Sequence, residues 1–212
     1  MTGTRQRWTI LTQFYRPEVG APQARLSAVA RGLQQHGHDV RVVTGMPNYP
    51  TGELADGYRR KPTLRETIDG VEVRRCWLYP ASGRRTASRL ANYLSFTVTS
   101  AVAVLLGPRP DVLVVEGQPL TLGLVGRALR RLRGVPYVYI VPDLQVDVAL
   151  ELGFVRSGRL LSAADRIERG TLQRAARVAT VTRAFRSTLV ERGADPEIAT
   201  RVLVRHVVGI GR

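Results

Sequence analysis

The chain has 212 residues, of which 44% are hydrophobic, enough for a packed core. Its formal net charge is +15, but the basic residues are scattered along the chain and Lys61 is the only lysine. As a binding partner, nucleic acid is therefore less favoured than an anionic membrane surface or a phosphorylated ligand. The single cysteine, Cys76, excludes an intramolecular disulfide and a thiolate metal cage, and we expect it to be a packed thiol.

The N-terminal region predicts a strand, a helix and a second strand. The apolar run 8–13 (WTILTQ) suits a buried strand, and two prolines and a glycine then prevent its continuing. Apolar residues recur at helical spacing from Ala24 until Gly37, and 39–44 (DVRVVT) is again strand-like. A right-handed βαβ unit places the loop 14–21 at the carboxyl end of the first strand, where open α/β sheets bind ligands.

No glycine-rich dinucleotide fingerprint or P-loop follows the first strand, so NAD or ATP binding through those motifs is disfavoured. The polar N-terminus, MTGTRQRW, has no apolar segment typical of a signal peptide, and we therefore expect a cytoplasmic chain.

A long polar loop and a hairpin are predicted next. Residues 45–62 are rich in Gly, Pro, Asn and Tyr, and a loop of this length in a compact domain is often functional. Asp69 and Gly70 then lie between two β-like runs, which is a strong signal for an antiparallel hairpin.

The most apolar stretch, residues 86–106, carries no charge after Arg89 and follows Arg84 and Arg85. A membrane span needs about 20 apolar residues, so this stretch is marginal, and several Ser, Thr and Asn residues dilute it. It predicts a buried crossover helix, with a helix lying in the membrane interface beside its arginines as the alternative.

Strands and helices alternate through the rest of the chain. We predict strands over 111–117, 136–143 and 177–182, and helices over 120–134, 157–176 and 183–193. This alternation indicates an α/β fold with a Rossmann-like, doubly wound parallel sheet.

Polar side chains follow several of the predicted strands. They are Arg16, Glu18, Asn48, Tyr49, Glu116, Gln118, Asp143 and Asp147. Any one of them could simply end a strand or cap a helix, but the carboxyl ends of parallel strands share one edge of the sheet. These residues belong to four loops, RPEVGAP, GMPNYP, VVEGQP and VPDLQVD, and four such loops at one edge favour a ligand site.

The segments LTQFYRPEVGAP, RGLQQHGHDVRVVTGMPNYPTG, VVEGQP and VPDLQVDVALELG, in this order, resemble the N-terminal half of family 4 glycosyltransferases with the GT-B fold. The resemblance is to the capsule, colanic-acid and O-antigen subgroup, which includes the fucosamine transferase type. It implies that this Rossmann-like domain binds the acceptor, while a second one binds the sugar donor, and that transfer usually retains the anomeric configuration. No metal and no cofactor is implied; the donor, a UDP- or GDP-sugar, is a substrate, and the acceptor is lipid-linked.

The resemblance also implies roles for individual residues. Gly20 corresponds to a glycine that lets backbone N–H groups approach the donor phosphates, and Arg16 could add charge-assisted contacts to them. Asp143 falls at the catalytic-cleft position, where it could bond a sugar hydroxyl or help to position the acceptor, and Asp147 is a second contact.

On the acceptor side, Glu116 and Gln118 are implied as contacts, and Asn48 and Tyr49 suit a loop that faces a sugar. The DLQVD segment departs from the Trp-Pro usual in the subgroup, which puts the conformation of this loop in question.

A larger departure concerns the donor domain, whose two glutamates lie eight positions apart in the family. No Glu in this chain has another Glu eight residues later. We therefore expect residues 1–200 to form the N-terminal domain, 201–212 an atypical tail, and the donor-binding domain to be absent, as in a truncated, split or frameshifted product or a deliberate fragment. A separate donor-domain chain and an anionic membrane surface are the expected partners, with peripheral location at the inner face of the plasma membrane. The alternative is a non-catalytic membrane- or partner-binding module.

Overall fold

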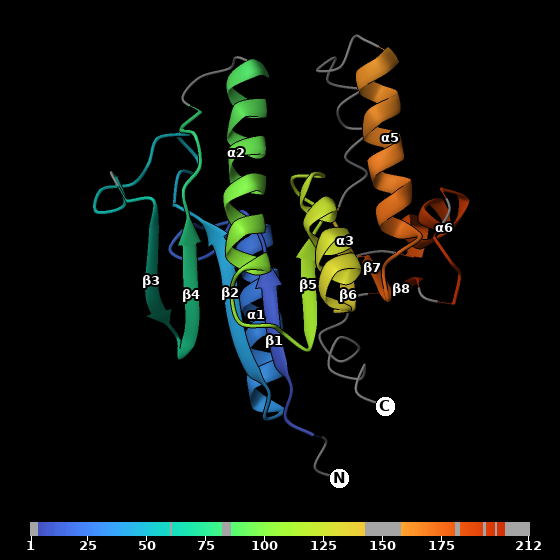
Figure 1. Ribbon diagram of the computed structural model, residues 1–212, viewed down its shortest axis with the longest axis horizontal. Coiled ribbons are helices and arrows are strands. Elements are labelled where there is room, and N and C mark those ends of the chain that lie inside the picture. Colours follow the sequence, from blue (N-terminus) through green and yellow to red (C-terminus); the bar gives the residue numbers. More distant parts are fainter. Residues whose placement is uncertain are drawn as a thin grey trace.

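A single twisted sheet organises the computed structural model, which describes residues 4–59, 61–81, 86–142, 158–180, 183–192, 194–197 and 199–201 (Figure 1). The described residues form eight strands. In sheet order they are β3 (Thr63–Ile68), β4 (Val71–Cys76), β2 (Asp39–Gly45), β1 (Arg7–Leu11), β5 (Val112–Glu116), β6 (Tyr137–Val141), β7 (Arg177–Thr180) and β8 (Ala199–Arg201). All neighbouring pairs are parallel except β3 with β4. The predicted α/β parallel sheet is confirmed.

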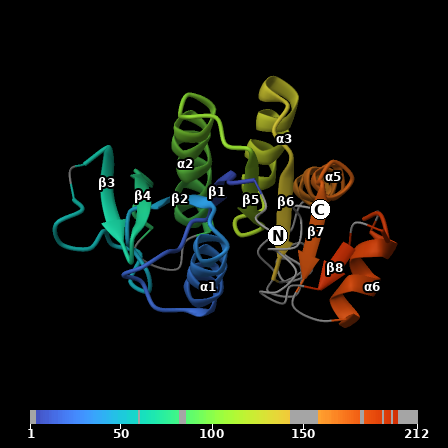
Figure 2. The ribbon, with the colours of Figure 1, turned by 90° about the horizontal axis from the view of Figure 1, so that it is seen from below.

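Helices cover both faces of this sheet. They are α1 (Ala21–Gln35), α2 (Thr86–Leu105), α3 (Leu122–Arg133), α5 (Gly158–Leu172) and α6 (Arg183–Glu191). Figure 2 shows α2, α3 and α5 side by side over one face, with α1 on the other, and α6 lies against β7 and β8 at the end of the sheet. This is the arrangement that right-handed crossovers in opposite directions from β1 produce.

The core consists of two layers because successive strand residues point to opposite faces of the sheet. In β1, Leu11 packs in the layer beneath α2 and α3, whereas Ile10 packs with α1. All residues of β5 and β6 are buried, as is typical of strands covered on both faces. By contrast β3, an edge strand, alternates between exposed and half-buried residues.

The predicted hairpin is present between β3 and β4. Asp69 and Gly70 have φ values of 49° and 75°, the left-handed conformation that a two-residue hairpin turn requires of both central residues. At α1, the helix begins at Ala21 rather than at Ala24, because a proline is tolerated in the first helical turn.

The helix predicted over 86–106 forms, but it is not buried on all sides. Asn92, Phe96 and Ser100 face the core, whereas the opposite face of α2 is exposed. Among the residues that the structure describes, no helix combines the length and hydropathy needed to cross a bilayer.

Candidate functional site

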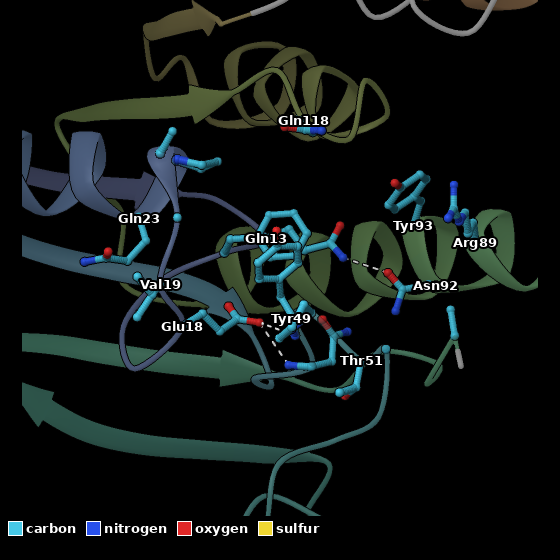
Figure 3. Close-up of a pocket in the computed structure, with 18 residues that line it drawn as sticks. Gln13, Glu18, Val19, Gln23, Tyr49, Thr51, Arg89, Asn92, Tyr93 and Gln118 are labelled. Atoms are coloured by element: carbon cyan, nitrogen blue, oxygen red, sulfur yellow. Dashed lines mark hydrogen bonds between the residues drawn. The ribbon is translucent and has the colours of Figure 1, made fainter. Parts of the chain in front are cut away.

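A cavity of about 680 Å³ opens at the carboxyl edge of the sheet, beyond the ends of β1 and β2 (Figure 3). Its walls come from the loop leading into α1, from the 48–52 loop after β2, from the N-terminal half of α2 and from the segment after β5. The three loops follow β1, β2 and β5, whose parallel register brings their carboxyl ends to one edge of the sheet, as expected from the sequence. The contribution of α2 was not expected.

Glu18 ties two of these loops together. Its carboxylate accepts hydrogen bonds from the backbone N–H groups of Asn48 and Tyr49, both at 2.9 Å, and from that of Tyr15 at 3.3 Å. Burial raises the pKa of Glu18, while these three bonds and the charge of Arg75 oppose the rise. A buried acceptor with three backbone donors fixes the relative position of the loops.

Two buried amides form another wall of the cavity. Gln13 donates to the Asn92 side-chain oxygen at 2.7 Å, and Asn92 donates in turn to the carbonyl of Tyr79 at 2.7 Å. Gln13 is only 2% exposed, and its Oε1 has no partner among the described residues. Because a buried carbonyl oxygen is costly to leave unpaired, Gln13 is suited to accept a hydrogen bond from a ligand.

The N-terminus of α1 also lines the cavity. Gly20 caps the helix with an extended backbone (φ 173°), no side chain caps the first turn, and the first turn contains no acidic residue. Uncapped N–H groups and the helix dipole favour an anion at this end. A Cβ on Gly20 would meet only Pro22 Cδ, at 3.7 Å, so the fold itself does not require glycine here.

The structure brings five of the residues singled out from the sequence together in this cavity: Glu18, Gly20, Asn48, Tyr49 and Gln118. Asn48 is buried and Tyr49 is 58% exposed, with its ring edge-on to Phe14 at 5.9 Å between centroids. Asp143 and Asp147 lie outside the described residues.

Glu116 differs from its expected role as an acceptor contact. Its side chain is fully buried and does not line the cavity. One oxygen accepts from Thr12 Oγ1 and the other from the Arg25 guanidinium, each at 2.6 Å. Burial raises the pKa of Glu116, and both partners oppose the rise. The geometry therefore supports an internal link between β5, the end of β1 and α1 rather than a ligand contact.

Arg16 also points elsewhere. Its guanidinium pairs with Asp69 at 2.8 Å, and its backbone carbonyl accepts a hydrogen bond from Arg75. Its side chain is directed to the β3–β4 turn and is not part of the cavity wall. In this geometry the predicted phosphate contact of Arg16 has no support.

Arg75 is a fully buried cation that the sequence analysis did not identify. It forms an ion pair with Glu66, donates to the carbonyl of Gly45 at 3.0 Å and lies 5.0 Å from the ring centroid of Tyr58. Its neighbour Cys76 is buried, and burial raises the pKa of that thiol to about 11, consistent with a packed thiol. Within the described ranges, no three His, Cys, Asp or Glu side chains gather as a metal site.

Besides bordering the cavity, α2 carries an exposed row of aliphatic side chains, which we name the α2 row: Leu90, Leu94, Val98, Val102 and, just beyond the helix, Leu106. Exposed fractions in the row run from 45% to 83%. The outer face of a surface helix is ordinarily polar, so a contiguous apolar row indicates a binding surface.

Comparison with known proteins gives a consistent result. A glycosyl transferase 4-like domain matches residues 20–204. The chain is 29% identical over 188 residues to WcaI, a colanic acid biosynthesis glycosyl transferase of Escherichia coli (strain K12). The aligned region covers 86% of this chain and 46% of that protein.

Solved structures match at lower identity. The catalytic domain of starch synthase IV from Arabidopsis thaliana, bound to ADP and acarbose, has a TM-score of 0.62 at 12% identity, covering 94% of this chain and 52% of that one. For HepE from Anabaena in complex with UDP-glucose the TM-score is 0.54 at 13% identity, with 93% and 43% covered.

The chain thus spans about half the length of these proteins. The structural matches cover nearly all of this chain and show its fold. Together with the domain match, they establish that the chain belongs to the glycosyl transferase 4-like family and has the fold of the N-terminal domain of GT-B glycosyltransferases.

Proposed function

We propose that this chain is the acceptor-binding half of a retaining, sugar-nucleotide-dependent glycosyltransferase of cell-surface polysaccharide synthesis. The cavity at the carboxyl edge of the sheet carries the proposal, because the uncapped end of α1 lies there beside the amides of Gln13, Asn92 and Gln118. An anion-binding helix end next to hydrogen-bonding amides suits a substrate that combines phosphates with sugar hydroxyls. A UDP- or GDP-sugar has this chemistry, and HepE, a protein of the same fold, binds UDP-glucose.

In this proposal the backbone N–H groups of Ala21 and Gln23 donate to the donor phosphates, since Pro22 has no N–H and that of Ala24 donates to the Gly20 carbonyl. The side chains of Gln13 and Asn92 bond sugar hydroxyls, and the rings of Phe14 and Tyr49 form an apolar wall for a sugar ring. Roles for Asp143 and Asp147 at the transfer site rest on the family resemblance alone.

Gly20→Asp tests the phosphate contact. Asp is a favourable helix cap, and neither the backbone nor the space at this position excludes a side chain, so folding should be retained. Its carboxylate would repel phosphate, and we expect the affinity for UDP or pyrophosphate to fall about tenfold relative to Gly20→Asn, which caps equally well without charge. An NMR-monitored titration with UDP or pyrophosphate measures the affinity of each variant. Equal binding by the two variants would argue against an anion site at α1.

We also propose that the domain associates with the inner face of the plasma membrane, where a lipid-linked acceptor would be presented. The predicted arginines Arg84 and Arg85 lie outside the described residues, so the structural support comes from the α2 row. Because α2 borders the cavity through Asn92 and Tyr93 and carries the row on its exposed face, one helix would connect the bilayer surface with the substrate site.

The α2 row gives a direct test of membrane affinity. We expect the chain to bind vesicles containing anionic lipid, with affinity that falls with salt because attraction to the surface is screened over about 10 Å at 0.1 M. Leu94→Gln with Val98→Gln should reduce binding at least fivefold without loss of stability, since both residues are exposed. The exposed Val19, in the loop before α1 rather than on α2, provides the control Val19→Gln, which is compared with the single change Val98→Gln. Poor pelleting with neutral and anionic vesicles alike would defeat the proposal.

A non-catalytic membrane-binding module is the second candidate function, and the α2 row favours it equally. The two differ in what the cavity does. Only the transferase proposal predicts that the domain contributes to sugar transfer when a donor domain is present.

A further inference from the structure

A second concave surface, separate from the cavity, lies between α3 and α5. This groove, with a volume of about 550 Å³, is lined by Arg127 of α3 and by residues of α5 and the turn that follows it: Ser162, Asp165, Arg166, Arg169, Gly170, Gln173 and Arg174. It shares no residue with the cavity wall. We name it the arginine groove.

Positive charge dominates the arginine groove. Asp165 is the only acid among the described residues that line it, and its carboxylate pairs with Arg169 at 2.9 Å. Three other guanidinium groups, those of Arg127, Arg166 and Arg174, share the same small surface. Like charges in such a cluster repel one another, so an anion that accepts several guanidinium hydrogen bonds would be favoured there.

The positive charge of these arginines also affects the pKa of Tyr137, which is buried beneath the helices. Burial raises the pKa of its phenol to about 12, and Arg127, Arg130 and Arg174 each oppose that rise. Arg127 and Arg130 of α3 and Arg174 after α5 therefore all lie within electrostatic range of this phenol.

Gly170 allows the two helices to bring these groups together. A Cβ on this residue would lie 2.9 Å from Arg127 Nη1, so a side chain here would displace the Arg127 guanidinium, and Arg174 Nη1 donates to the Gly170 carbonyl at 3.3 Å. The Arg127 guanidinium thus lies against the backbone of α5 at Gly170, and it is the flexible end of this side chain that would move.

Figure 1 shows α2, α3 and α5 over the same face of the sheet, with α3 between the other two. The α2 row belongs to the first of these helices, and the arginine groove is lined by the other two. Leu124 and Leu132 of α3, the helix between α2 and α5, are further exposed apolar side chains. An apolar strip beside a concentration of arginines is the pattern of proteins that lie on an anionic bilayer, where the strip enters the headgroup region and the cations meet phosphates.

We infer that the arginine groove binds the phosphate of an anionic lipid headgroup and thereby sets the orientation in which the α2, α3 and α5 face meets the bilayer. This inference rests on the proposed membrane association and assigns its headgroup site. A lipid rather than a soluble phosphate is favoured because the groove shares its face with the α2 row.

The test compares charge removal in the groove with equal charge removal elsewhere. Arg127→Gln with Arg166→Gln is compared with Arg31→Gln and Arg65→Gln, which removes two exposed charges from α1 and from the edge strand β3. Binding is measured to vesicles of phosphatidylcholine with and without phosphatidylglycerol. We expect the groove variant to bind anionic vesicles about thirtyfold more weakly, since each arginine near the surface contributes about a fivefold factor, and the control to change less than threefold.

A third variant, Gly170→Ala, retains all the charge. Alanine favours the helix, so the variant should fold, but its Cβ displaces the Arg127 guanidinium, and we expect at least threefold weaker binding to the anionic vesicles. Thermal unfolding in inorganic phosphate provides a separate measurement for a soluble ligand.

The outcomes separate the hypotheses. Equal losses in the groove and control variants would show that only net charge matters, and vesicle binding unchanged by the groove variant would overturn the site while leaving membrane association through the α2 row intact. Absence of binding by the unaltered chain would overturn both. Stabilisation by millimolar phosphate, lost in the groove variant, with no difference between the variants on vesicles, would assign the groove to a soluble anion and overturn the lipid headgroup.

Discussion

The purified chain alone should transfer no sugar from a UDP- or GDP-sugar to a lipid-linked acceptor, and activity should emerge when a donor-binding domain from a related enzyme is added. In the proposal the cavity offers the donor phosphates the end of α1, and the second domain that the family resemblance implies holds the rest of the donor. Holding both substrates in register contributes roughly 7–11 kcal/mol to lowering a barrier, and half of a shared site cannot provide it. The expected rate of the single chain is therefore at background.

The assay incubates the chain, the donor domain and their mixture with each nucleotide sugar and acceptor, and measures labelled lipid product. The mixture made with Gly20→Asp is the matched control, because that variant should fold but bind phosphate poorly. Product formed by the chain without an added domain would contradict the prediction. Activity only on mixing would favour the transferase proposal over the non-catalytic module.

Local sequence patterns were sufficient to predict most of the fold. The apolar runs that become β5 and β6 are buried throughout, and the Asp69–Gly70 pair predicts its turn because few residues tolerate that conformation. The 86–106 helix was predicted, but the sequence pattern did not decide between burial on all sides and an exposed apolar face, as in the interfacial alternative. Whether a neighbouring element covers a helix depends on tertiary packing, which a pattern of apolar residues does not specify.

The site could be predicted only as far as the edge of the sheet. Glu116 is the last residue of β5, so its place at the carboxyl edge follows from the sequence, but its burial depends on Arg25, which is 91 residues distant in the chain. Likewise Arg16 is drawn from the cavity by Asp69 in the β3–β4 turn. Long-range ion pairs of this kind decide where a side chain points, and no local motif contains them.

Gln13 and Asn92 were not identified as site residues for a related reason. Gln13 lies at the end of an apolar segment and Asn92 is one of several polar residues within another, and 79 residues separate the two. Their polarity in buried positions was the available signal, since buried amides require partners. This signal predicts that each amide has a hydrogen-bond partner, but which residue is the partner depends on the contact between α2 and the end of β1.

Removing the Glu18 side chain should have the largest effect on stability among the cavity residues. In Glu18→Ala, three backbone N–H groups lose their acceptor, two of them at 2.9 Å. A buried unsatisfied donor costs about 1–3 kcal/mol, so we expect the free energy of unfolding to fall by roughly 3 kcal/mol. In Glu18→Gln the amide oxygen can still accept from Asn48 and Tyr49, and the loss should be below about 1.5 kcal/mol.

The dependence on pH distinguishes the charge of Glu18 from its hydrogen bonds. Because the pKa of Glu18 is raised in the folded state, mainly by burial, the native state holds its proton more tightly than the unfolded chain, whose value is near 4.5. The stabilisation linked to this proton is complete below pH 4.5 and is lost as the pH rises through the folded value. Wild type should therefore lose stability relative to Glu18→Gln as the pH rises above about 4.5, while Glu116, whose pKa is also raised, contributes equally to both proteins. Asp39 and Asp111, whose pKa values are lowered by Arg5 and Arg7, act below this window. Urea unfolding at several pH values measures the difference, and a difference that stays constant with pH would refute the assignment.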